Sequence, residues 1–95
     1  MLVQVRQVHI DRAVRHRQQN TTYYPTGYCP IALALRDMGF KRISVSRPTA
    51  QFSKDGTTLH TAKLPEEAEE FMDRFDGRGH VTPLTFILEI DHARS

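Results

Sequence analysis

The residues best suited to recognition chemistry are the arginines and tyrosines in the first half of the chain. Arginine binds phosphate and carboxylate groups through paired hydrogen bonds, and tyrosine stacks on unpaired bases or anchors protein interfaces. If folding gathers these side chains on one face, they predict an anion-binding or nucleic-acid-binding surface. The set is Arg12, Arg15, Arg17, Tyr23, Tyr24, Tyr28, Arg36, Lys41, Arg42 and Arg47.

Cys29 is the only cysteine, and it directly precedes Pro30, the expected first residue of a helix. The helix dipole and the free amides of the first turn could lower the pKa of this thiol and make it reactive. No base is positioned beside Cys29 by the local sequence, so a buried or capping cysteine is the favoured interpretation. A lone cysteine also cannot form an internal disulfide, in keeping with a reducing compartment.

The histidines show no spacing typical of a metal site, because neither HExxH nor paired Cys/His motifs occur. The chain also lacks a glycine-rich phosphate loop, a GxSxG elbow and a paired-carboxylate signature. We therefore predict a protein that is not an enzyme and that holds no metal or cofactor. The histidines are His9, His16, His60, His80 and His92.

Charge is distributed unevenly along the chain, whose formal net charge is +2. Residues 1–54 hold nine Lys/Arg against two acidic residues, a net charge of +7, whereas residues 55–95 hold four against nine, a net charge of −5. Such asymmetry can steer a charged partner, or the two halves can simply attract each other. The acidic run Glu66, Glu67, Glu69 and Glu70 is interpreted as a solvated helix face, with docking of a basic partner surface as the functional alternative.

Apolar periodicity predicts helices that would position these groups. The first is short, basic and amphipathic, with Ile10, Ala13 and Val14 at helical spacing. It is followed by a loop, and then by an apolar helix that ends at Gly39. The last carries a buried stripe of Ala68, Phe71, Met72 and Phe75. The expected ranges are 9–18, 30–38 and 65–77 for the helices and 18–28 for the loop.

Alternating residues predict strands at 2–8, 40–47 and 84–90, and Asp55-Gly56 predicts a two-residue hairpin turn that pairs Phe52 with Leu59. The final strand is the most apolar and is expected at the centre of the sheet. The expected fold class is α+β. It consists of a single domain, 1–95, with a mainly antiparallel sheet of four to five strands, and two main helices and one short N-terminal helix packed on one face.

Four short motifs, in this order, resemble a family of small uncharacterised bacteriophage and prophage proteins, notably those of actinobacteria. They are the helix start CPIALAL at 29–35, Leu64-Pro65, Phe75-Asp76-Gly77 and the segment VTPLTF at 81–86. The resemblance spans about two-thirds of the chain and implies a phage accessory role in the host bacterial cytoplasm. It implies no reaction and no catalytic residue.

Two functions remain open. The first is a non-enzymatic phage accessory protein that engages and inhibits a host protein or nucleoprotein machine, such as a CRISPR or transcription complex. The alternative is a DNA- or RNA-binding module that uses the basic, tyrosine-containing half. A cytoplasmic location and no membrane partner are expected, because Gln4, Arg6 and Gln7 interrupt any apolar leader. The sequence leaves monomer and homodimer open.

Overall fold

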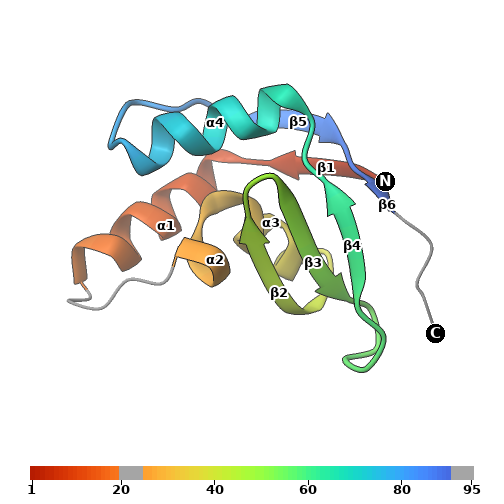
Figure 1. Cartoon of the computed structure of the whole chain (residues 1–95). Coiled ribbons are helices and arrows are strands. Elements are labelled where there is room, and N and C mark those ends of the chain that lie inside the picture. The colour runs from red at the N-terminus through yellow and green to blue at the C-terminus, as the bar shows by residue number, and fades with distance from the viewer. Residues whose placement is uncertain (20–24, 91–95) are drawn as a thin grey trace.

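The computed structural model describes residues 1–19 and 25–90 as four helices and six strands (Figure 1). The predicted α+β class is confirmed, and every strand pairing is antiparallel. In chain order the elements are β1 (Leu2–Val5), α1 (Gln7–Gln19), α2 (Pro25–Tyr28), α3 (Pro30–Asp37), β2 (Lys41–Ser46), β3 (Thr49–Ser53), β4 (His60–Lys63), α4 (Glu66–Asp76), β5 (Leu84–Ile87) and β6 (Glu89–Ile90).

The strands form two sheets where one was expected. β1 and β5 make a two-stranded sheet, and the other four strands follow the order β2-β3-β4-β6. The predicted strand 84–90 is divided at Leu88, whose backbone exchanges hydrogen bonds with Met1 while the residues beyond it pair with β4. The segment therefore joins the two sheets. The expectation of a central strand is wrong, because β5 belongs to a sheet of two strands and β6 lies at the edge of the four-stranded sheet.

The first helix is longer and starts earlier than predicted. β1 ends at Val5, because the Arg6 N–H donates to Nδ1 of His9 and the helix begins at Gln7. It then continues to Gln19, since glutamine is a good helix former. With 13 residues α1 is the longest described helix, so the expectation of a short N-terminal helix is wrong. The end of the predicted loop 18–28 is also helical, as α2.

The core is built around α3, whose first six residues are all buried. α3 contacts α1, α2, β1 and β2, and Figure 1 shows it beneath β1 and beside β2. Val3 and Val5 of β1 and Phe86 of β5 are buried in the same cluster. The helices therefore do not form one layer on one face of a sheet, because α3 fills the space between the two sheets.

The hairpin between β3 and β4 differs by one residue from the predicted register, because Phe52 lies opposite His60 and Leu59 is exposed. The type I′ turn that Asp-Gly favours would require positive φ at both central residues, but of the two only Gly56 has it, at 88°. Asp55 instead accepts hydrogen bonds from the Thr58 and Thr57 amides at 2.9 and 2.8 Å. These bonds widen the turn into a six-residue connection between Ser53 and His60.

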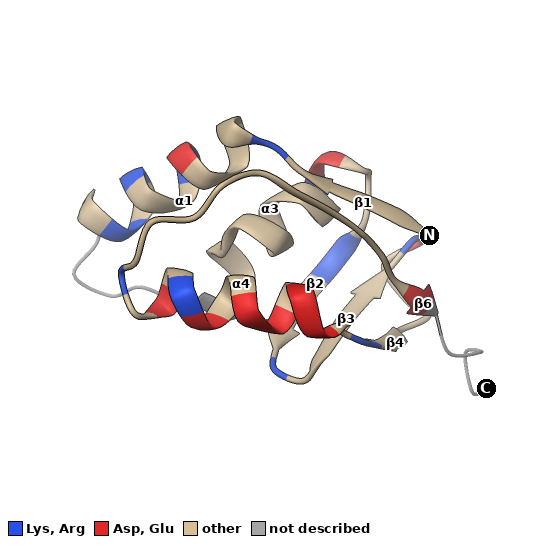
Figure 2. Ribbon diagram, turned by 90° about the horizontal axis from the view of Figure 1, so that it is seen from above, with Lys and Arg blue, Asp and Glu red and all other residues tan. Residues whose placement is uncertain are grey.

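α4 agrees with its prediction in both its ends and its faces. Pro65 is the N-cap residue and Gly77 the C-cap residue, and the stripe from Ala68 to Phe75 is buried. The opposite face carries acidic side chains, which form red bands along α4 in Figure 2. Negative charge in the first turn is favourable, because it faces the positive end of the helix dipole. α4 also contacts β5.

Candidate binding surfaces

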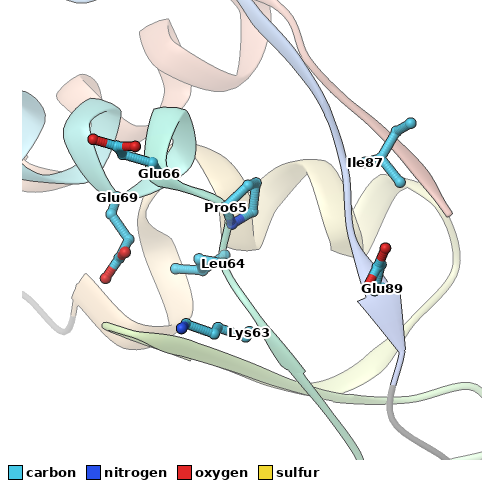
Figure 3. A pocket seen from close by; sticks show the side chains of 7 residues that line it. All are labelled: Lys63, Leu64, Pro65, Glu66, Glu69, Ile87 and Glu89. Carbon is cyan, nitrogen blue, oxygen red and sulfur yellow. The ribbon is translucent and has the colours of Figure 1, made fainter.

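A groove of about 780 Å³ lies where α4, β4 and the β5–β6 segment meet, and we call it the acidic groove (Figure 3). Figure 3 shows two glutamates of α4 on one side, Ile87 and Glu89 on the other, and Leu64 and Pro65 between them. The groove is lined by Lys63, Leu64, Pro65, Glu66, Glu69, Ile87 and Glu89.

Local structure explains how these side chains come to share one groove. Pro65 is the N-cap residue of α4 and has extended backbone angles, with φ −69° and ψ 163°. The helix begins at the next residue, so its first turn follows directly after the end of β4. Leu88 is fully buried, and alternation along an extended chain therefore directs Ile87 and Glu89 outward. As a result Ile87 is 64% exposed, although it is a large apolar residue.

The acidic groove carries excess negative charge. It is lined by three carboxylates, Glu66, Glu69 and Glu89, and by one cation, Lys63. Within residues 1–19 and 25–90, none of these three glutamates lies within ion-pair distance of a basic side chain. Glu66 and Glu89 are exposed and Glu69 is half-buried, so this groove favours a cationic partner that also has apolar contact surface.

Four arginines of the predicted basic surface form ion pairs or hydrogen bonds with other residues of the chain. Arg12 pairs with Asp37 at 3.2 Å, and Arg47 pairs with Asp73 and Asp76 of α4. Arg17 donates to the Phe75 carbonyl at 3.0 Å and lies over the Phe75 ring, 4.5 Å from its centroid. Arg36 donates to the Gly27 carbonyl at 3.5 Å and lies 5.5 Å from the centre of the Tyr28 ring. The attraction between the two halves of the chain is therefore partly satisfied by folding.

The other members of the set are spread over separate elements. Arg15 lies exposed on α1, while Lys41 and Arg42 lie exposed on β2. Figure 2 shows basic residues on α1, on β2 and near the end of α4. Tyr28 stacks on His16, with ring centroids 4.0 Å apart. Tyr23 and Tyr24 lie outside the described residues.

Cys29 has the structural role that the sequence favoured. It is fully buried as the N-cap residue of α3, and its Sγ accepts a hydrogen bond from the Ala32 N–H at 3.4 Å. Burial raises the pKa of the thiol to about 11, because desolvation outweighs the helix-end amides that act in the opposite direction. The thiolate needed for nucleophilic attack is therefore scarce at neutral pH.

A buried histidine network was missed from sequence. His9 is only 2% exposed, and its Nε2 lies 2.7 Å from Oδ2 of Asp37. Its Nδ1 accepts from the Arg6 N–H at 2.9 Å, so the ring proton resides on Nε2 and is donated to Asp37. With both ring nitrogens engaged, His9 orients helices and has no nitrogen left to act as a base. The position of His9 three residues after Arg6, at a helix start, was the available signal.

Further findings bear on the other expectations. In the described part of the chain, no three His, Cys, Asp or Glu residues gather as metal ligands. None of the described helices has both the length and the apolar character needed to span a membrane. Comparison of the chain with protein-family models, curated proteins and solved structures gave no match.

Proposed function

We propose that the chain is a non-enzymatic binding protein whose acidic groove docks a basic surface of a partner protein. The phage resemblance suggests the setting: an accessory protein that engages and inhibits a host protein or nucleoprotein machine. The groove itself carries this proposal, because exposed Ile87 sits among three carboxylates that no described cation neutralises. Apolar contact supplies affinity, and unpaired negative charge selects a basic partner.

Direct binding of DNA or RNA is the second candidate, and it rests on the cations that folding leaves without an ion pair. Arg15, Lys41 and Arg42 are exposed and have no ion pair among the described residues. They lie on α1 and β2, whereas three carboxylates, those of Glu66, Glu69 and Glu89, line one groove. The concentrated charge on this molecule is therefore negative, which favours a basic protein partner over a polyanion.

The test is a tagged capture experiment from nuclease-treated host lysate that compares two double variants of α4. Glu66→Gln with Glu69→Gln neutralises the groove, while Glu67→Gln with Glu70→Gln removes equal charge outside it. We expect the groove variant to reduce recovery of a captured protein by about tenfold and the control variant to leave recovery nearly unchanged. Equal recovery with both variants, or equal loss with both, overturns the proposed role of the groove.

Nucleic-acid binding is measured separately, by fluorescence anisotropy with labelled DNA and RNA at rising salt. Binding that falls steeply with salt and is lost on charge reversal at Arg15 and Arg42 would support the second candidate. Arg17 is unsuitable for this test, because its contact with Phe75 makes charge reversal there a folding defect. No anisotropy change at low salt eliminates direct nucleic-acid binding.

A further inference from the structure

The outer edge of β1 has backbone groups that no described strand satisfies. Met1 and Leu88 exchange both backbone hydrogen bonds, with N···O distances of 3.0 and 2.8 Å. In an antiparallel pair such exchange recurs at every second residue, so Val3 and Val5 bond to β5. The N–H and C=O groups of Leu2 and Gln4 therefore point away from β5, toward the open edge.

The β2 edge of the four-stranded sheet is protected against pairing with another strand, whereas the β1 edge is not. β2 is one of the two edge strands of the four-stranded sheet, and its pairing with β3 is irregular between Lys41 and Ser44. Arg42 has a positive φ of 51°, and Lys41 and Arg42 are both exposed. A bulge and charged side chains are the devices that prevent edge-to-edge pairing. Residues Leu2–Val5 have neither charge, proline nor bulge.

A groove of about 290 Å³ lies beside β1 and is lined by Leu2 and Gln4 of β1, by Ala34 and Met38, and at one end by charged Arg6 and Asp37. Leu2 is 54% exposed and Met38 is 43% exposed, so both would lose apolar surface to an added strand. Strand addition satisfies main-chain groups in pairs and seats alternate side chains in neighbouring pockets. The edge and its groove together fit an extended segment of chain.

We propose that this edge pairs antiparallel with β1 of a second copy, producing a continuous sheet in the order β5-β1-β1-β5. Leu2 and Gln4 lie symmetrically about Val3, so a twofold axis beside Val3 places Leu2 of each copy opposite Gln4 of the other. Each Leu2–Gln4 pair then exchanges both backbone hydrogen bonds, as an isologous interface requires. Neither residue is charged, so self-pairing places no like charges opposite each other. This proposal does not depend on the acidic groove.

Sedimentation velocity of the full chain across micromolar to millimolar concentrations tests the pairing, with two matched variants. Leu2 and Ile87 are cross-strand neighbours on the same exposed face, but only Leu2 belongs to β1, the strand that is proposed to pair. We expect the wild type to shift toward twice the mass of one chain. Leu2→Lys should raise the dimer dissociation constant at least about tenfold, and Ile87→Lys less than about threefold.

Amide hydrogen exchange followed by NMR locates the interface independently of mass. The Leu2 and Gln4 amides should exchange slowly in concentrated samples and fast after dilution, while Val3 and Val5 stay protected in both. A chain that remains monomeric at the highest concentration overturns the proposal. So does a dimer in which the Leu2 and Gln4 amides remain unprotected, or one that both lysine variants weaken equally.

Discussion

The Asp37 carboxylate connects α3 to α1, and its removal should destabilise the fold. In Asp37→Ala, the Nε2–H of His9 loses its acceptor at a site that is almost fully buried. An unsatisfied buried donor costs about 1–3 kcal/mol, and loss of the partly exposed Arg12 pair adds about 0–1 kcal/mol. We expect the free energy of unfolding to fall by about 2 kcal/mol, with a Tm decrease of roughly 4–8 °C for each kcal/mol.

Two further variants separate the contributions to this loss. Asp37→Asn keeps a carbonyl oxygen that can accept from His9, so it should cost less than about 1 kcal/mol. Arg12→Ala removes only the exposed ion pair, whose N···O distance is 3.2 Å, and should cost about 0–1 kcal/mol.

Urea unfolding followed by far-UV circular dichroism gives each free energy from the midpoint and slope. If Asp37→Ala proves no more destabilising than Arg12→Ala, the buried hydrogen bond does not stabilise the fold and the structural role of His9 is refuted.

Three other outcomes follow from individual contacts. Cys29 should react with a thiol reagent only as fast as the chain opens, because the thiol is fully buried and its pKa is raised to about 11; fast labelling of the folded chain at neutral pH would contradict this. Arg17→Ala should lower the free energy of unfolding by about 1–2 kcal/mol through loss of the Phe75 contacts, and an unchanged urea midpoint would show that these contacts contribute nothing. Hydrogen bonds from the Thr58 and Thr57 amides lower the pKa of Asp55 from its ordinary value of 3.8. These hydrogen bonds stabilise the fold fully above pH 3.8, and the stabilisation is lost as pH falls below that value. The difference in free energy of unfolding between the wild type and Asp55→Asn should therefore shrink in acid. A difference that does not change with pH in urea unfolding would refute the role of the Asp55 carboxylate.

The local features of the fold could be predicted because their causes lie within a few residues. Pro30 marked the start of α3 and Gly39, with φ 97°, marked its end. The stripe on α4 followed from helical spacing alone. The hairpin register failed because the side chain of Asp55 captured two amides, an interaction that the dipeptide pattern did not reveal.

The candidate sites could be predicted from the sequence only in part. The run of glutamates on α4 was visible in the sequence, but Glu89 and Ile87 joined Glu66 and Glu69 only through the path of β5 and β6. The basic set was equally visible, but the internal contacts of Arg12, Arg17 and Arg47 depend on partners far away in the sequence. Neither the acidic groove nor the open edge of β1 has a short-range signature, because both depend on which strands become neighbours.

The sequence by itself determined α3, α4, their apolar faces and the polarity of charge, since these depend on residue type and spacing. Tertiary structure decided which charged side chains remain free to bind a partner. Arg17 reaches Phe75 and Arg47 reaches Asp73 across long stretches of chain, and Arg12 reaches Asp37 on another helix. Hydrogen bonds and ion pairs depend on distance in space, so an arginine that looks free in the sequence can be engaged once the chain has folded.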